Sequence, residues 1–185
     1  MKNLKHDIFR YCGVDSSKAY FSAVLFRAGA RFMFLYRMCN KFSKYNPIGI
    51  FFRLWFKAIS VRYVVEIPHA TKIGKGLFMT HFQGIIFNQS AIIGENCNIS
   101  QGVTIGRESR GKRKGSPTLG NRVMVGANSV VVGNIKIGDN VLIGPCTFVN
   151  FDVPSNSVVL GSPGKIISSE KGSEGYLKNI LKPEN

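Results

Sequence analysis

His81 is the side chain of this sequence whose type and surroundings best fit acid–base chemistry. It interrupts a ladder of aliphatic residues in the segment MTHFQG, whereas His6 lies in a polar start and His69 follows a proline. A neutral imidazole can take a proton from a hydroxyl near pH 7, so it suits general-base catalysis of acyl transfer to an alcohol. Its spacing alone leaves a purely structural histidine equally open.

Glu66 is the carboxylate best placed to orient that imidazole. The surrounding chain repeats every six residues, and Glu66 precedes His81 by fifteen residues, three short of one coil of three repeats. We therefore expect Glu66 to approach the ring across the stack. No carboxylate cluster or histidine pair has the spacing of a metal site, and no glycine-rich phosphate loop is present, so we expect no metal.

The six-residue repeat, from Ile67 to about Val149, predicts the fold. Short fixed periods indicate stacked coils, here an all-β core formed by a parallel β-helix with three short strands per coil. Glycine often follows the aliphatic position and allows the bend between strands. A β-sandwich fits less well, because period-2 alternation does not place glycine at every sixth position. The inward positions are Ile67, Ile73, Met79, Ile85, Ile93, Ile99, Ile105, Leu119, Val125, Val131, Ile137, Ile143 and Val149.

The hexad frame breaks twice. Two extra residues between Ile85 and Ile93 predict a local bulge, and eight extra residues between Ile105 and Leu119 predict a loop at 107–117. That loop reads RESRGKRKGSP and is strongly basic. Loops that interrupt a rigid repeat often carry binding residues, so this loop is a candidate binding element.

Three parts are expected along the chain. Residues 1–60 lack hexads and form an α-helical region, residues 61–167 form the β-helix, and residues 168–185 form a polar tail, loosely helical or disordered. Apolar spacing predicts one helix over Ser17–Lys44, and Asn46-Pro47 introduces a second helix at about 47–59.

The second predicted helix allows two interpretations. It is very apolar, with Arg53 and Lys57 one turn apart. Such a helix can lie on a membrane surface with its basic side chains reaching phosphates. Alternatively, it can pack against the β-helix or another subunit, and we favour this second interpretation.

Composition indicates the class of partner and the compartment. The formal net charge of +15 predicts anionic partners, such as phosphates, acidic glycans, an anionic membrane or nucleic acid. Four scattered cysteines favour a reducing compartment over a disulfide framework. The polar start lacks a signal peptide and no apolar run is long enough to span a membrane. We therefore expect a cytoplasmic protein, peripheral to the inner membrane at most.

Residues 20–167 resemble the serine acetyltransferase family of hexapeptide-repeat acyltransferases. The resemblance rests on VEIPHATKIGKGLFMTHFQG, on VMVGANSVVVGNIKIGDNVLIGPCTFV and on GSPGKII. The His-x-x-Gly placement after the first coils and a basic loop before Ser-Pro are specific to this branch. The resemblance implies a left-handed β-helix, and a homotrimer that binds acetyl-CoA between neighbouring subunits.

The resemblance also implies roles for particular residues. His81 matches the catalytic base, and Glu66 stands where the family has the aspartate that orients it. Lys165 is a candidate for a phosphate of the cofactor. The positions that match cofactor-binding residues are Gly106, Ala127, Pro145, Pro163 and Lys165.

The acceptor half departs from the family. Asp15 lies near the family's acceptor-binding aspartate, and Thr80 replaces the acidic residue before the catalytic histidine. Gly115 and Ser116 replace an Arg-His pair that holds the amino-acid carboxylate. Losing such a charge-assisted contact costs roughly 1.5–3 kcal/mol. The helical region is also shorter than in housekeeping members of the family.

Shortened, basic relatives of this kind resemble the acetyltransferases of bacterial surface-polysaccharide pathways. That resemblance makes the main expectation an acetyl-CoA-dependent O-acetyltransferase acting on a sugar hydroxyl of a bacterial capsule, exopolysaccharide or lipopolysaccharide. The alternative is a serine O-acetyltransferase of cysteine biosynthesis. A non-catalytic basic scaffold for nucleic acid or membrane is less favoured, because no aromatic residues are interleaved in the loop to stack on bases. We expect no nucleic-acid partner, and a trimer that covers Phe87, Phe148 and Phe151 on flat outer faces.

Overall fold

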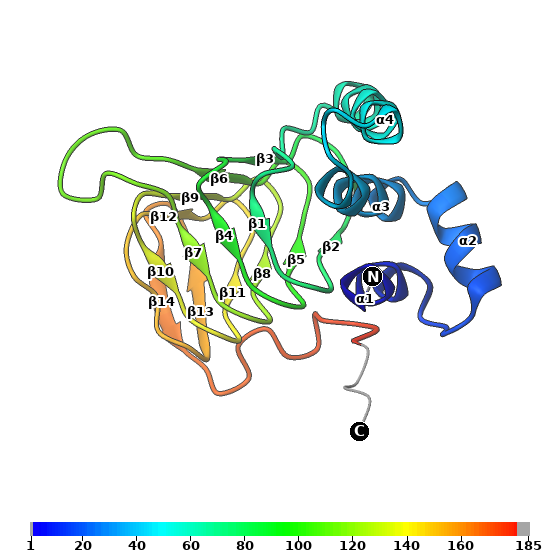
Figure 1. Ribbon diagram of the computed structural model, residues 1–185. Helices are drawn as coiled ribbons and strands as arrows, with labels where there is room; N and C mark the ends of the chain where they lie inside the picture. The colour runs from blue at the N-terminus through cyan, green and yellow to red at the C-terminus, as the bar shows by residue number, and fades with distance from the viewer. Residues whose placement is uncertain (1, 181–185) are drawn as a thin grey trace.

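The computed structural model describes residues 2–180 and consists of four helices followed by a coil of short strands (Figure 1). The helices are α1 (Lys2–Cys12), α2 (Ser17–Phe26), α3 (Ala28–Lys41) and α4 (Pro47–Tyr63). The strands are β1 (Lys72–Ile73), β2 (Phe78–Met79), β3 (Ile86–Phe87), β4 (Ile92–Ile93), β5 (Asn98–Ile99), β6 (Thr104–Gly106), β7 (Thr118–Leu119), β8 (Met124–Val125), β9 (Val130–Val132), β10 (Lys136–Ile137), β11 (Leu142–Ile143), β12 (Phe148–Val149), β13 (Ser157–Leu160) and β14 (Lys165–Ser168).

The helical end has more breaks than its spacing predicts. The stretch expected as one helix divides at Arg27, whose backbone is extended, and α1 precedes it in the polar start. Ser16 caps α2 by accepting a hydrogen bond from the Ala19 N–H, and Asn46 caps α4 ahead of Pro47. The helical end thus runs to Tyr63, three residues past the expected boundary at 60.

The coil is the predicted left-handed parallel β-helix. Its strands form three sheets, ordered β1-β4-β7-β10, β3-β6-β9-β12 and β2-β5-β8-β11-β13-β14. Equivalent residues of successive coils pair in register, for example Ile93 with Leu119 and Ile99 with Val125. Among the strands of residues 2–180, β14 alone runs antiparallel, where it folds back on β13 and ends the stack.

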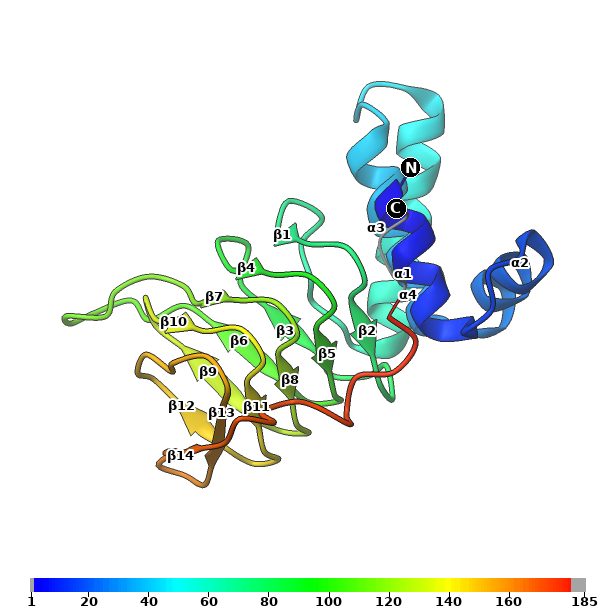
Figure 2. The same ribbon diagram turned by 90° about the horizontal axis from the view of Figure 1, so that it is seen from below.

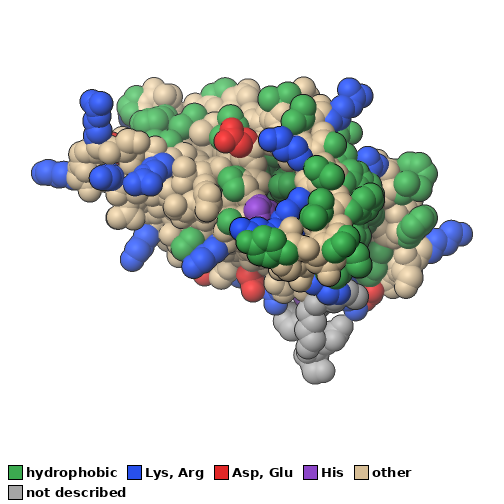
Figure 3. Space-filling view, turned by 45° about the horizontal axis from the view of Figure 1, so that its top comes forward, with side chains coloured by type: hydrophobic (Ala, Val, Ile, Leu, Met, Phe, Trp, Pro, Cys, Tyr) green, Lys and Arg blue, Asp and Glu red, His purple; other side chains and the backbone are tan. Residues whose placement is uncertain are grey.

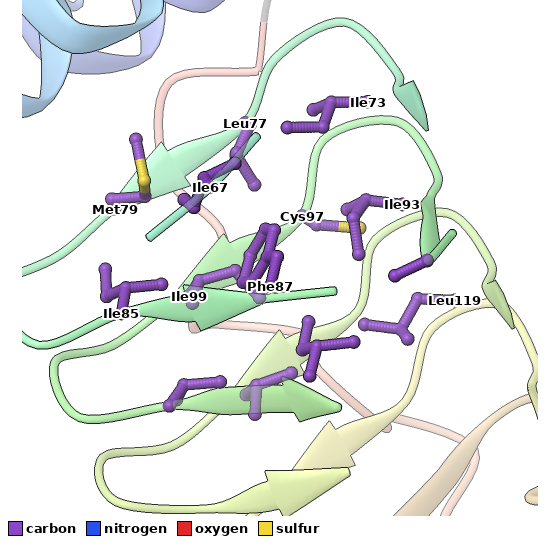
Figure 4. Close-up of a cluster of buried hydrophobic side chains, with 14 of the residues drawn as sticks. Ile67, Ile73, Leu77, Met79, Ile85, Phe87, Ile93, Cys97, Ile99 and Leu119 are labelled. Atoms are coloured by element: carbon purple, nitrogen blue, oxygen red, sulfur yellow. The ribbon is translucent and has the colours of Figure 1, made fainter. Parts of the chain in front are cut away.

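Aliphatic side chains fill the interior of this coil (Figure 4). Every inward position of the predicted frame is buried, and Ile73, the most exposed, keeps only 7% of its surface. Phe87 was expected on an outer face, but it is 2% exposed and pairs with Ile105 inside the coil. Ile86 takes the outward position and is 41% exposed.

The position of Phe87 corrects the first frame break. Because strands β3 and β4 are six residues apart and β2 and β3 are eight apart, the two extra residues lie between Met79 and Phe87. The break is therefore in the turn that holds His81, not between Ile85 and Ile93. Ile85 is also apolar and buried, so the apolar pattern continues through it. The sequence therefore does not reveal where the two extra residues lie.

Buried polar groups join the helical end to the first coils. The Arg37 guanidinium donates to the Asp7 carboxylate at 2.7 Å and to the Ile73 carbonyl at 2.9 Å. Asp7 also accepts from the Gly76 N–H at 2.7 Å, and it is fully buried. Burial raises the pKa of the Asp7 carboxyl, while Arg37 and the Gly76 N–H act in the opposite direction.

The tail after β14 returns along the coil to the helices (Figure 2). The Asn98 side chain donates to the Tyr176 carbonyl at 2.9 Å, and the Asn179 side chain donates to the Arg10 carbonyl at 3.2 Å. The tail, the first coils and α1 therefore meet on one side of the molecule. Among the described residues, no helix combines the length and apolar character needed to span a membrane.

Candidate active site

One corner of the β-helix holds most of the candidate residues. The turns after β2, β5, β8 and β11 stack there, linked by backbone hydrogen bonds. Gly102 N–H donates to the Gln83 carbonyl at 3.1 Å, Asn128 N–H to Gln101 at 3.0 Å, and Cys146 N–H to Ala127 at 2.8 Å. Ala127 and Pro145, two candidate cofactor positions, are thus equivalent residues of successive coils.

His81 belongs to a two-residue bulge in this corner. Because Gln83 aligns with Gln101, and Thr80 pairs with Ile99 as Ser100 pairs with Val125, the extra residues are His81 and Phe82. Phe82 is buried, with its ring centroid 5.0 Å from that of Phe32 and 5.4 Å from that of Tyr63.

His81 itself is exposed and adopts a left-handed φ of 48°. Other turns of the coil use the same conformation, for example Asn128 (φ 58°) and Cys146 (φ 54°) in this corner, so it marks a turn of the backbone. The anchored phenylalanine and the left-handed backbone together present the imidazole outward from the regular coil.

A cavity of about 620 Å³ lies beside His81. Helices α1 and α3 form one wall, the outer faces of β2, β5 and β8 form another, and the returning tail closes a third side. Its lining comprises Arg10, Tyr11, Phe26, Arg27, Ala28, Gly29, Phe78, Met79, Thr80, His81, Phe82, Asn98, Met124, Tyr176, Lys178 and Asn179.

The cavity is electropositive. Arg10, Arg27 and Lys178 line it, and no aspartate or glutamate is among its lining residues. The first residues of α3, Ala28 and Gly29, also line it, and no side chain caps this helix end. Free N–H groups and the helix dipole both favour an anion at that position.

Arg10 is part of the wall. Its guanidinium donates to the Gly76 carbonyl at 3.1 Å and to the Asn98 side chain, while its Nε has no partner among the described atoms. Burial lowers the pKa of Arg10 to about 10, so the group stays cationic at neutral pH. Next to it, the buried Tyr11 hydroxyl accepts from the Met79 N–H at 2.9 Å, which holds the strand that leads to His81.

The backbone of Glu66 lies close to the bulge that contains His81. Its N–H donates to the Ile85 carbonyl at 2.8 Å and its carbonyl accepts from Phe87 N–H, so it pairs with the segment that follows His81. Its exposed side chain borders a separate hollow against α4. Among the described residues no hydrogen bond joins Glu66 to His81, so the orienting role stays a prediction.

The candidate acceptor residues are dispersed. Thr80 lines the cavity next to His81. Asp15 accepts from the Tyr20 hydroxyl at 2.7 Å and lies 3.0 Å from the Lys5 amine, outside the cavity. These two bonds keep the pKa of the Asp15 carboxyl below its usual value. Ser116 donates to the Asn88 side chain at 3.0 Å, on another corner of the coil.

Loop 107–117 extends away from the helical end (Figure 1). Its ends pair through Glu108 and Gly115 in both directions at 2.9 Å. A Cβ on Gly115 would lie 2.8 Å from the Asn134 Cβ, so an arginine there would require the neighbouring turn to move. Gly106, which precedes the loop, likewise lies on a sheet that does not carry His81.

Pro163 and Lys165 lie where the coil ends. Pro163 follows a cis peptide bond in the turn between β13 and β14, and Lys165 is exposed at the start of β14. They extend the end of the stack that is farthest from the helices (Figure 2). In one chain, the candidate cofactor residues therefore span the coil from its middle to its end. Among the described residues, no group of three or more metal-ligating side chains is gathered.

Comparisons with known proteins agree with the β-helix described above. Residues 116–150 match the bacterial transferase hexapeptide (six repeats) family. The chain is 46% identical over 103 residues to a serine acetyltransferase of Synechococcus elongatus, covering 56% of this chain and 42% of the relative. It is 42% identical over 107 residues to that of Helicobacter pylori, covering 58% and 63%.

A solved structure is similar over more of the chain. The serine acetyltransferase of Neisseria gonorrhoeae in complex with serine superposes with a TM-score of 0.73 at 28% identity, over 90% of this chain and 68% of that one. The chain is thus similar to the serine acetyltransferases among the hexapeptide-repeat transferases. It spans between 42% and 63% of the length of these two curated relatives.

The expected sugar acceptor was wrong. The curated relatives to which the chain is 42–46% identical are serine acetyltransferases, and the similar solved structure bears the same name. The sugar hypothesis, and with it a role in polysaccharide synthesis, rested on the missing Arg-His pair at Gly115 and Ser116. It did not anticipate the cations beside His81. Arg10, Arg27 and Lys178 come from distant segments, so no local spacing could reveal that they meet.

Proposed function

We propose that this protein transfers the acetyl group of acetyl-CoA to the hydroxyl of L-serine. The observation that carries the proposal is the cationic cavity beside an exposed histidine. Such a cavity suits a small acceptor that has a carboxylate near its hydroxyl. Serine has both groups, and the relatives' name supports the same acceptor.

His81 is the proposed general base. Its neutral imidazole accepts the serine hydroxyl proton as that oxygen attacks the thioester carbonyl carbon. When the tetrahedral intermediate collapses, the carbon–sulfur bond breaks and the imidazolium returns the proton to the departing thiolate. Glu66 is the proposed orienting group, which would stabilise the imidazolium without taking the proton.

Arg27 and Lys178 are the proposed carboxylate ligands. Both are exposed cations at the cavity, whereas Arg10 already bonds to Gly76 and Asn98 and contributes its charge from the wall. The uncapped start of α3 adds backbone N–H donors on the same side. Together these groups would replace the clamp that Gly115 and Ser116 cannot form.

Acetyl-CoA is the proposed co-substrate, bound along the corner of Ala127 and Pro145 and reaching Pro163 and Lys165. We further propose a homotrimer. Gly106 and Ser116 lie away from His81 within one chain, so a neighbouring subunit would have to supply them. The outer faces expose Ile86 and Ile92, which are 41% and 40% accessible and would be covered by such packing.

Release of free CoA thiol tests the proposal. L-serine is the expected acceptor, and ethanolamine is the matched control, because it keeps the amine and hydroxyl but lacks the carboxylate. We expect kcat/KM for L-serine to exceed that for ethanolamine at least tenfold, the lower end of what one lost charge-assisted contact costs. Equal turnover of both acceptors, or of neither, would refute serine as the substrate.

A further inference from the structure

The outer face of α4 is apolar along its whole length. Its apolar side chains are exposed, although Val61 near its end also borders the hollow beside Glu66, while Ile59 and Gly49 are buried. The exposed fractions are 46% for Ile50, 58% for Phe51, 67% for Leu54, 37% for Trp55 and 69% for Val61. A helix with one face in the core and an apolar opposite face needs a second apolar environment.

The apolar surface continues onto α2. A groove of about 880 Å³ lies between α4 and α2, lined almost wholly by carbon, with Trp55 and Phe52 on one side and Phe21 and Leu25 on the other. Phe21 is 71% exposed. Figure 3 shows hydrophobic side chains gathered over the helical end, with lysines and arginines around them.

Charge decides which occupant this surface fits. Residues 1–63 contain twelve lysines and arginines but only two acidic residues, Asp7 and Asp15. Asp7 is buried against Arg37, and Asp15 pairs with Lys5. A second copy would bring an equally basic surface against this one, so like charges would oppose that contact. An anionic surface is complementary.

We propose that the apolar faces of α2 and α4 dock on the surface of an anionic phospholipid bilayer. The apolar side chains would enter the boundary between headgroups and acyl chains, while exposed cations such as Lys44, Lys57 and Arg62 reach the phosphates. Trp55 lies on this face, and tryptophan favours the interfacial layer. The surface is separate from the cavity beside His81, so the inference does not depend on the acceptor.

Trp55 makes the proposal directly measurable, because it is the single tryptophan of the chain. The full-length protein is mixed with phosphatidylcholine vesicles that contain or lack phosphatidylglycerol, and its emission is recorded. We expect a blue shift and quenching by brominated acyl chains with the anionic vesicles alone, weakening as salt is raised. No response, or an equal response to neutral vesicles, would overturn the proposal.

Two pairs of substitutions separate the apolar contribution to membrane partitioning from the electrostatic one. Phe51→Gln with Leu54→Gln removes exposed apolar groups and is expected to weaken partitioning about 100-fold. Lys57→Gln with Arg62→Gln removes two cations and is expected to weaken it about 20–30-fold. Ile167→Gln, 50% exposed at the other end of the coil, is the matched control and should leave partitioning unchanged.

The competing occupant is a second copy of the chain. Its signature would be a Trp55 blue shift that grows with protein concentration in the absence of lipid, together with a doubling of the mass in light scattering. Loss of both effects in the Phe51 and Leu54 variant would assign this face to self-association and overturn the bilayer proposal. Unchanged circular dichroism of each variant establishes that lost partitioning is not lost folding.

Discussion

The β-helix and the helical end differ in how completely they bury their apolar side chains. In the coil, each outward residue alternates with an inward one, and stacking neighbours bury side chains such as Ile99 and Val125 completely. In the helical end, apolar residues of α3 such as Phe32 share the core of the first coils and a buried ion pair joins Asp7 to Arg37, while apolar residues such as Leu54 remain outside. The coil is a repetitive scaffold, whereas the helical end carries most of the net positive charge.

This difference assigns the two regions different parts of the proposed site. The coil contributes His81, through a two-residue departure from an otherwise regular corner. The helical end contributes Arg10, Arg27 and the start of α3. The chemical step should therefore depend on the coil, and acceptor recognition should depend on the helical end.

Replacing the histidine of the coil should have the largest effect. His81→Ala is expected to lower kcat about 10²–10⁴-fold, since general-base catalysis typically contributes that factor. Acetyl-CoA binding, measured by calorimetry, should survive because its proposed contacts lie in later coils. Full activity of the variant toward L-serine would show that His81 is structural and that the coil does not supply the base.

Breaking the attachment between the regions should have the next largest effect. Asp7→Ala leaves Arg37 without its buried partner and the Gly76 N–H without its acceptor, so the free energy of unfolding should fall by about 3–5 kcal/mol. Denaturant titration measures it. Asp15→Ala, which removes an exposed carboxylate paired with Lys5, is the matched control and should change stability little. Equal losses in both would mean that the buried pair does not attach the helices.

Removing a cation of the helical end should affect recognition alone. Arg27→Ala is expected to raise KM for L-serine about 10–100-fold with little change in kcat, because a contact to the carboxylate acts equally before and during the reaction. Lys18→Ala, also on the helical end but outside the cavity, should leave both constants unchanged. A fall in kcat without a change in KM would contradict the division between regions.

The orienting carboxylate should have the smallest effect. Glu66→Gln keeps the size of the side chain but removes its charge, and we expect kcat to fall on the order of tenfold, less than in His81→Ala. Steady-state rates at saturating serine measure it. A loss as large as that of His81→Ala would make Glu66 a participant in proton transfer, and no loss at all would leave it outside the site.

The repeat was predictable because its signal is local. Each inward residue recurs every six positions, so Ile67 through Val149 could be assigned before any contact was known. The resemblance to serine acetyltransferases selected His81, Ala127 and Pro145 as candidates, and their roles stay predictions. The place of the bulge was not predictable, because buried Ile85 continues the apolar pattern and hides the shift at His81 and Phe82.

The sequence by itself determined the coil, since its pattern repeats along the chain and every repeat has the same neighbours. Only the tertiary structure decided the cavity. Arg10, Arg27 and Lys178 are far apart in the chain, and they meet because α1 attaches through Asp7, the helices divide at Arg27, and the tail returns along the coil. Such convergence depends on how separate elements pack, which no periodicity records. For the same reason, the structure alone showed that Leu54 and its neighbours on α4 face outward.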